Sequence, residues 1–323
     1  MRLEIEHAFA FEYDGYISES FLELRVQPKT TPAQTVLAFG LAVGPRARVY
    51  RYVDWNDNAT HHFTITKFHD RIEVRATSLV ETRAPGVEFG KLGPPAAADA
   101  LPYPLLDFLA FDGPVRLTPA LRGAHAALTL SAEAPIGEQV LTMAHALSER
   151  FEYQKDVTRY DSTTEDFLKL GKGVCQDFAH LMLGWLRLSG IACRYVSGYL
   201  HVDGKKREPS QSHAWVEFYA PPVGWIAFDP THSRLVDERY VVVGHGRHYD
   251  DVPPNRGIYR GPARETLTAE IYTRSVASTS IPRAADEVRT IELRTFATAP
   301  ARRGATPTLP PAAEEQAEQQ QQQ

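Results

Sequence analysis

One cysteine at the start of an apolar helical pattern is the residue of this chain best placed for nucleophilic chemistry. Cys175 follows a glycine-containing loop, Gly171 to Gly173, and Gly190 marks a plausible end of the helix. A thiol at a helix N-terminus lies at the positive end of the macrodipole, which favours the thiolate, the nucleophilic form. The alternative for a lone cysteine is a small core residue. Apolar residues recur at spacings of three and four and predict one buried face: Phe178, Leu181, Met182, Trp185 and Leu188.

Two strand patterns further along the chain supply a candidate base and its partner. Residues 212–219 alternate like a strand, and residues 223–229 form a second such pattern. A hairpin centred on Pro221 would place His213 directly opposite Asp229, with their Cβ atoms about 5 Å apart. A carboxylate there could orient the imidazole toward a thiol. Because a one-residue slip would put the two side chains on opposite faces, this inference depends on the turn.

These segments resemble the bacterial transglutaminase-like family of thiol enzymes, and the resemblance extends over roughly residues 1–275. It implies an α+β fold. An N-terminal β-sandwich-like domain would precede a papain/transglutaminase-like core, in which a catalytic helix packs on an antiparallel sheet. The matching motifs are Gly173 to His180, Arg194 to Leu200, Ser212 to Val216, Trp225 to Thr231 and Gly246 to Pro254.

The resemblance also implies a larger site around a Cys175, His213 and Asp229 triad. His180 lies about 140° round the helix from Cys175 and should point away from the thiol. His232 departs from the asparagine that many relatives carry near that position, and Cys193 fits a buried apolar residue. The residues expected to bind substrate or to support the triad are Gln176, Asp177, His180, Trp215, Tyr249 and Asp250.

The chemistry predicted from this triad is acyl transfer at an amide bond of a peptide or protein. The thiolate attacks the carbonyl, His213 shuttles the proton, and the backbone N–H of Cys175 helps to bind the oxyanion. Water would then complete hydrolysis, whereas an amine would complete a transglutaminase reaction. Hydrolysis is the first expectation, because no feature identifies an amine site. The chain carries no feature that calls for a cofactor.

Two other classes of function remain as alternatives. A zinc enzyme could use Cys175, His213 and His232. No paired metal-ligand spacing accompanies them, so we predict no metal site. A catalytically inactive binding module on the same fold is the other alternative, although such a module has no chemical need for all three triad residues.

Length, composition and cysteine usage limit the setting of this chemistry. The 323 residues are enough for two domains, and 43% hydrophobic with 23% charged residues is ordinary for a globular protein. The net charge of −5 argues mildly against a nucleic-acid partner. No apolar run approaches the ~18 residues of a membrane span, and the first residues lack the apolar core of a secretory signal. Cys175 and Cys193 are poorly placed for a disulfide, so a cytoplasmic location is expected.

The order of patterns predicts an N-terminal β-rich domain over residues 1–130 and a catalytic core over 131–280. Helices are expected at 136–151 and 164–170, the second opened by a capping box from Ser162 to Glu165. The Pro- and Gln-rich segment 298–323 predicts a disordered low-complexity tail. Strands are expected near 3–13, 21–26, 34–43, 47–54, 60–67, 71–82, 192–202, 240–244 and 268–276.

Overall fold

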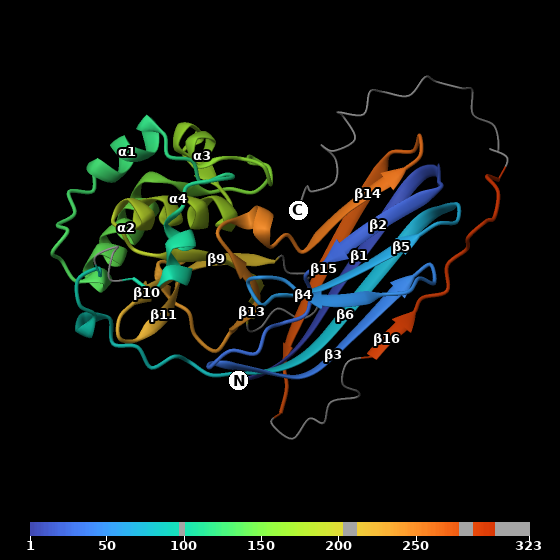
Figure 1. Cartoon of the computed structure of the whole chain (residues 1–323), viewed down its shortest axis with the longest axis horizontal. Helices are drawn as coiled ribbons and strands as arrows, with labels where there is room; N and C mark the ends of the chain where they lie inside the picture. Colours follow the sequence, from blue (N-terminus) through green and yellow to red (C-terminus); the bar gives the residue numbers. More distant parts are fainter. Residues whose placement is uncertain (97–100, 203–211, 278–286, 301–323) are drawn as a thin grey trace. The chain divides into compact units, whose positions relative to one another are not determined.

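The computed structural model describes residues 1–96, 101–202, 212–277 and 287–300, which form two compact units (Figure 1). Of the described residues, the first unit comprises 1–82, 200–202, 253–277 and 287–300, and the second comprises 83–96, 101–199 and 212–252. The first is built of strands and the second combines helices with a sheet. The α+β class predicted from the sequence is therefore confirmed, and each unit is described by itself below.

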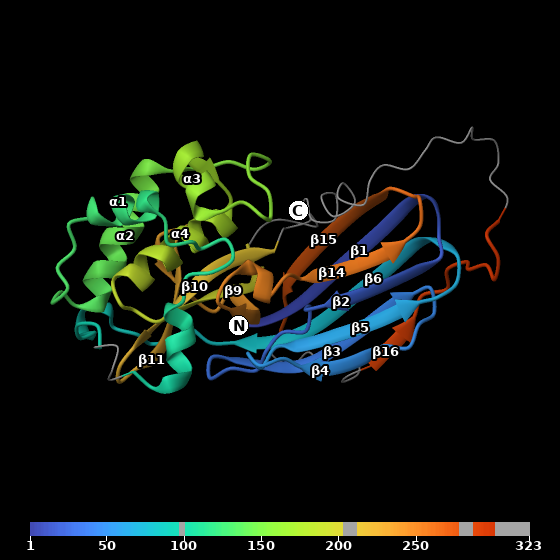
Figure 2. The same cartoon turned by 45° about the horizontal axis from the view of Figure 1, so that its top comes forward.

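Two sheets make up the first unit (Figure 2). The five-stranded sheet has the order β15-β1-β6-β3-β16, and the four-stranded sheet has the order β14-β2-β5-β4. All pairings are antiparallel except that of β16 with β3. The strands are β1 (Arg2–Ile17), β2 (Glu19–Leu24), β3 (Gln34–Gly44), β4 (Tyr50–Val53), β5 (Ala59–Ile65), β6 (His69–Thr82), β14 (Asn255–Arg260), β15 (Glu265–Ser275) and β16 (Glu287–Thr290).

The core of this unit comes from the side chains that both sheets turn inward. Buried and half-buried residues alternate along β1, as a strand with one covered face requires. The inward side chains of the two sheets form one apolar cluster, which fits the predicted sandwich. Its members include Phe9, Phe11, Leu22, Leu24, Leu41, Phe63 and Val74.

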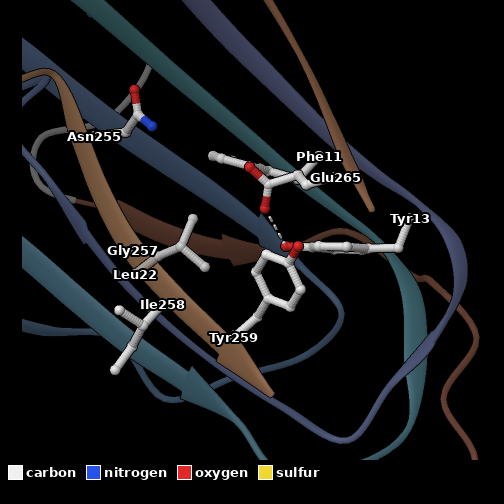
Figure 3. Close-up of a pocket in the computed structure, with 8 residues that line it drawn as sticks. All are labelled: Phe11, Tyr13, Leu22, Asn255, Gly257, Ile258, Tyr259 and Glu265. Carbon is white, nitrogen blue, oxygen red and sulfur yellow. Dashed lines mark hydrogen bonds between the residues drawn. The ribbon is translucent and has the colours of Figure 1, made fainter. Parts of the chain in front are cut away.

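The Tyr13 and Glu265 side chains form a polar pair that is buried within this sandwich (Figure 3). The Tyr13 hydroxyl donates to Glu265 Oε2 over 2.7 Å, beside a cavity of about 10 Å³ that Phe11, Leu22 and Tyr259 also line. Burial raises the pKa of the Glu265 carboxyl, and the hydrogen bond from Tyr13 only partly opposes this shift. The cavity is of the size that holds a single water molecule.

In the second unit, helices α1 to α4 lie together on one side of a five-stranded sheet of order β12-β11-β10-β9-β13 (Figure 1). Helix α4 packs on β10, and its central residues are buried on every side. The elements are η1 (Phe89–Lys91), η3 (Tyr103–Leu109), α1 (Pro119–Ala126), α2 (Ile136–Arg150), β7 (Glu152–Tyr153), α3 (Thr164–Leu170), β8 (Lys172–Gly173), α4 (Cys175–Leu188), β9 (Cys193–Leu200), β10 (His213–Ala220), β11 (Gly224–Asp229), β12 (Arg234–Leu235), β13 (Tyr240–Gly246) and η4 (Tyr249–Asp251).

The helices follow the sequence closely, with one difference at a cap. Helix α3 spans the predicted residues, but its capping box joins Thr163 to Asp166 rather than Ser162 to Glu165. Both pairs have the required spacing of three. The structure uses the later pair because Thr163 is the residue with extended backbone angles immediately before the helix.

The structure divides the chain differently from the predicted boundaries. Strands β14 and β15 lie in the range predicted for the core, yet they pair with β2 and β1 of the first unit. Residues 83–130, predicted as part of the β domain, belong to the second unit. A strand's partner depends on pairing across the whole chain, which a local pattern does not reveal. The charged segment 203–208, and the predicted tail from residue 301 onward, lie outside the described residues.

Candidate active site

Cys175 is the first residue of α4, and a buried carboxylate fixes the loop that presents it. Asp177 Oδ2 accepts the Val174 N–H over 2.8 Å and the Thr158 hydroxyl over 2.6 Å. A Cβ on Gly173 would lie 2.4 Å from the same oxygen, so the loop requires glycine there. Burial raises the pKa of Asp177, although both hydrogen bonds oppose this shift. Asp177 therefore supports the start of the helix, and Cys175 itself stays half-buried.

The hairpin of β10 and β11 brings His213 and Asp229 together in a register different from the predicted one. Val216 pairs with Phe228 and Ala220 with Gly224, which centres the hairpin on Pro222. The predicted direct opposition of His213 and Asp229 is therefore wrong by two residues, because the turn consists of residues 221–223. Since side chains alternate with period two, a two-residue shift keeps both groups on one face. They meet as diagonal neighbours, within reach of an imidazole ring.

The imidazole is bonded to the carboxylate on one side and to the thiol on the other. His213 Nε2 lies 2.7 Å from Asp229 Oδ2. Burial lowers the pKa of His213, but hydrogen bonds to Asp229 and to Cys175, together with their charges, outweigh it and raise the pKa to about 10. Because Nε2 is engaged by the carboxylate, Nδ1 is the nitrogen available to the sulfur. In this arrangement the imidazole can take the proton of the neighbouring thiol and hold it against Asp229.

Asp229 is fully buried and accepts hydrogen bonds on both oxygens. Oδ2 also accepts from the Tyr240 hydroxyl and lies by His232 Nδ1, each over 2.7 Å, while Oδ1 accepts the Thr231 N–H over 2.9 Å. Burial alone would raise the pKa of Asp229, but the hydrogen bonds from His213, His232 and Tyr240 and the His213 charge hold it well below the usual range. The carboxylate is therefore ionised at neutral pH.

Trp215 lies on the same strand as His213 and supports it from within. Its fully buried ring packs edge-on against Tyr240, with centroids 5.3 Å apart, and lies 6.1 Å from the His213 ring. A Cβ on Gly198 would lie 2.5 Å from the indole, so glycine on the neighbouring strand makes room for it. By filling this space, Trp215 holds His213 and Tyr240, two of the donors to Asp229, in place.

Gln176 and His180 hold neighbouring segments to α4. The Gln176 amide donates to the Tyr160 carbonyl over 2.7 Å, and His180 Nε2 accepts the Tyr249 N–H over 3.2 Å. His180 is buried against the Tyr195 ring, and burial holds its pKa well below the usual value. It is a neutral packing residue that faces Tyr195 and η4.

Tyr249 and Asp250 lie in η4, directly after β13. The Tyr249 ring meets the Tyr195 ring edge-on, with centroids 6.3 Å apart. The Asp250 carboxylate lies 3.6 Å from His248 Nδ1. Burial, followed by the charges of Cys175, Tyr249, Asp177 and Asp250, raises the pKa of Tyr195. The Tyr195 ring thus contacts both His180 of α4 and Tyr249 of η4.

Three tyrosines near the site were missed by sequence reasoning. Tyr240 belongs to a predicted strand, but its bond to Asp229 depends on a strand pairing that the sequence does not show. Tyr195 lies inside the Arg194 to Leu200 motif, and that motif was the available sequence signal for it. Tyr153 lies on β7, which pairs with β8 just before Cys175, and its side chain is 45% exposed. Burial and the charge of Cys175 raise the pKa of Tyr153 to about 12. It lies between the predicted helices 136–151 and 164–170, where no element was expected.

The polar atoms of His213, Asp229 and His232 are spaced for hydrogen bonds rather than for metal coordination. Among the described residues, one group of potential ligand atoms lies within 4.8 Å, that of His213, Asp229 and His232, and it excludes Cys175. Two ligands of a tetrahedral zinc ion with 2.0 Å bonds lie about 3.3 Å apart. The 2.7 Å separations of the two imidazole nitrogens from Asp229 Oδ2 are those of hydrogen bonds.

The second cysteine is buried. The Cys193 thiol points to the Leu183 carbonyl over 3.5 Å, and burial raises its pKa to about 11. It is an inert core residue, as expected. Both cysteines are free.

Comparison with known proteins identifies the family. Residues 123–230 match the model of the transglutaminase-like superfamily core, and residues 3–81 match that of the bacterial transglutaminase-like N-terminal region. An uncharacterised protein of Mycobacterium leprae is 34% identical over 271 residues, which cover 80% of this chain and 94% of that protein. The chain belongs to the transglutaminase-like superfamily. Within this superfamily it is also 28% identical to a protein-glutamine gamma-glutamyltransferase of Pseudomonas aeruginosa, over 38% of this chain and 21% of that protein.

A solved structure shows the same fold. "A Putative Cysteine Protease from Cytophaga hutchinsonii" superposes with a TM-score of 0.73 at 21% identity, covering 87% of this chain and 93% of that one. The predicted transglutaminase-like core and its N-terminal sheet region are thereby confirmed as a fold. In the described part of the chain, every helix is too short or too polar to cross a membrane.

Proposed function

We propose that this protein is a thiol hydrolase of amide bonds in peptides or proteins, acting through a Cys175, His213 and Asp229 triad and an acyl-enzyme. The observation that carries the proposal is the position of the His213 imidazole, which is hydrogen-bonded to the buried Asp229 carboxylate through Nε2 and to the Cys175 thiol. Membership of a superfamily that contains thiol enzymes supports it.

The geometry suggests the following steps. The Cys175 thiolate attacks the amide carbonyl, and the negative charge that develops on oxygen meets the N–H of Cys175, which lies in the first turn of α4 where no intrahelical acceptor is available. His213 gives its proton to the leaving amine as the C–N bond breaks, which leaves a thioester on the sulfur. Water then attacks the thioester, His213 takes the proton of that water, and the acid and the thiolate are released.

Transfer of the acyl group to an amine is the second candidate, and the similarity to a protein-glutamine gamma-glutamyltransferase favours it. The first half of the reaction would be the same. The two outcomes differ only in whether water or an amine resolves the thioester. A reducing, cytoplasmic setting remains the expectation from the two free cysteines, because it would keep the Cys175 thiol available.

The first experiment measures iodoacetamide alkylation of Cys175 from pH 4 to 10 in wild type and in His213→Ala. A free thiol with a pKa of ~8.5 is almost wholly protonated at pH 6, so rapid alkylation there shows an activated thiolate. We expect that reactivity to be lost in His213→Ala. A Cys193→Ala variant, in which alkylation should be unchanged, is the control for the site of reaction.

Product analysis then separates the two candidates. Glutamine-containing peptides are incubated with and without a primary amine, and released ammonia is compared with incorporated amine. Hydrolysis predicts ammonia or peptide cleavage that is independent of the added amine. Equal alkylation of wild type and His213→Ala, with free-thiol behaviour, would instead favour an inactive binding module.

A further inference from the structure

The carboxylate of the proposed triad is shared among three donors. Asp229 Oδ2 lies 2.7 Å from His213 Nε2, from His232 Nδ1 and from the Tyr240 hydroxyl. A carboxylate oxygen offers about two lone-pair sites, so three donors on one oxygen compete for it. The bond that orients His213 is therefore not independent of the other two.

The two imidazoles on this oxygen differ in their surroundings. The His213 side chain is 10% exposed, whereas the His232 side chain is 46% exposed. Their ring centroids are 5.3 Å apart. His232 also donates its backbone N–H to Asp229 Oδ1 over 3.3 Å, so one residue binds both carboxylate oxygens. Its ring lies at the surface and fills no core space, which leaves the hydrogen bond to Asp229 as its evident role.

Tyr240 completes the set from the other side. Its hydroxyl donates to Asp229 and accepts from Arg234 Nε and Nη2, over 3.1 and 3.0 Å. A guanidinium that donates to a hydroxyl polarises its O–H bond and makes it a stronger donor. The groups facing the carboxylate are thus His213 from β10, His232 from the turn after β11, Tyr240 from β13, Arg234 behind Tyr240, and Cys175 beyond His213.

We infer that His232 is a positioning residue of the site. Together with Tyr240 it takes up part of the hydrogen-bonding capacity of the Asp229 carboxylate, and so limits how strongly that carboxylate holds the His213 imidazole. The inference rests on the proposed function and deepens it. Removal of the His232 donor leaves more of the carboxylate charge to His213. A neutral donor and a protonated one act in the same direction, because either withdraws negative charge from His213.

The test compares His232→Ala and His232→Asn with wild type, in the full chain. Two readouts follow the proton on His213: NMR titration of its Cε1–H, and the pH profile of Cys175 alkylation by iodoacetate. The carboxylate of iodoacetate is attracted by the protonated imidazole, so the rate falls when His213 loses its proton. We expect the pKa of His213 to rise by about one pH unit in His232→Ala, the size of one hydrogen bond to a charged group.

His232→Asn keeps an N–H donor within the side chain. It should bring the pKa of His213 at least halfway back from the His232→Ala value to the wild-type value. Tyr240→Phe should shift the profile in the same direction as His232→Ala. His145→Ala, which removes another exposed histidine on α2, is the matched control and should shift nothing. A His232→Ala titration that coincides with wild type, or moves to lower pH, overturns the inference. A wild-type thiol whose reactivity does not depend on His213 overturns the proposed function instead.

Discussion

At the scale of single residues, the main feature of the site is the proton that the His213 imidazole holds. The His213 imidazole lies between a buried carboxylate and a thiol, and its two hydrogen bonds with their charges overcome the cost of burying a cation. The same interactions that would make the thiol reactive also contribute to the stability of the fold. The stability of this protein should therefore depend on pH through His213.

The expected pH dependence follows from the direction of this shift. The folded pKa of His213, about 10, lies above the unfolded value of ~6.5. Its contribution to the free energy of unfolding is complete below about pH 6.5 and is lost as the pH rises through 10. The Tm of wild type should therefore exceed that of His213→Gln most at pH 6, and the difference should shrink by several degrees by pH 10, at roughly 2–4 °C per kcal/mol.

Thermal unfolding followed by circular dichroism between pH 6 and 10 checks this expectation. Titrating groups that do not contact His213 are common to both proteins, so they cancel in the difference. A gap in Tm that is constant over the range would show that His213 takes no proton from solution on folding.

Residue identity was the easiest part of the site to predict. Cys175, His213 and Asp229 could be selected because each has a chemical reason to stand near the others. Tyr240 could not be selected, since a tyrosine in a strand is usually a packing residue. His232 could be noted only as a departure from related sequences. Its contact with Asp229 depends on the turn that follows β11.

At the scale of elements, the loop from β8 into α4 is the structure that positions Cys175, the proposed nucleophile. Asp177 ties the loop to Thr158 and to Val174, and the absence of a side chain at position 173 leaves room for its carboxylate. The start of the helix is thus held by a buried acid and a glycine, and neither needs to touch the substrate.

We expect Gly173→Ala to weaken this arrangement. The added methyl group would lie 2.4 Å from Asp177 Oδ2 and 2.8 Å from its Cγ, so the carboxylate must move from the Val174 N–H. A forced fit of this kind costs about 1–3 kcal/mol. Urea denaturation should show that loss, and Cys175 alkylation at pH 6 should slow.

Gly123→Ala is the matched control, because a Cβ there meets nothing within 4 Å. Glycine is a poor residue inside a helix such as α1, so this variant should be unchanged or up to ~1 kcal/mol more stable. Equal behaviour of the two variants would show that the Asp177 carboxylate can shift at no cost.

Elements were predicted better than their registers and partners. Helix α3 and the start of α4 agree with the sequence because caps, apolar spacing and a terminal glycine are local signals. The hairpin register was wrong by two residues, because the three-residue turn lies at 221–223 rather than 220–222, and two prolines do not reveal its position. The return of β14 and β15 to the first unit left no local signal at all.

At the scale of the whole molecule, the described chain has two large apolar cores, one for each unit. Ile72 on β6 is buried in the core of the first unit, and Ile226 on β11 is buried in the core of the second. Each core is built from its own strands. The two units should therefore lose protection separately when one of these side chains is shortened.

Reciprocal variants test this separation. Ile72→Ala should cost about 2–5 kcal/mol and accelerate hydrogen exchange in β1 and β6, while the amides of α4 keep their protection. Ile226→Ala should have the reverse effect, and each variant is the control for the other. Faster exchange in both units from either change would indicate one cooperative unit.

The pairing of β15 with β1 also has a consequence for folding during synthesis, because the two strands are made at widely separated times. β1 pairs with residues about 250 positions further along the chain, from Tyr13 with Glu265 to Leu3 with Ser275. A ribosome that adds ~5–20 residues per second needs roughly 10 to 50 seconds to reach the partner strand. Throughout that interval the outer edge of β1 is bare, and bare strand edges recruit other strands. All residues of the second unit, which contains Cys175, are made within the same interval. The nascent chain therefore contains Cys175 before the five-stranded sheet of the first unit is complete.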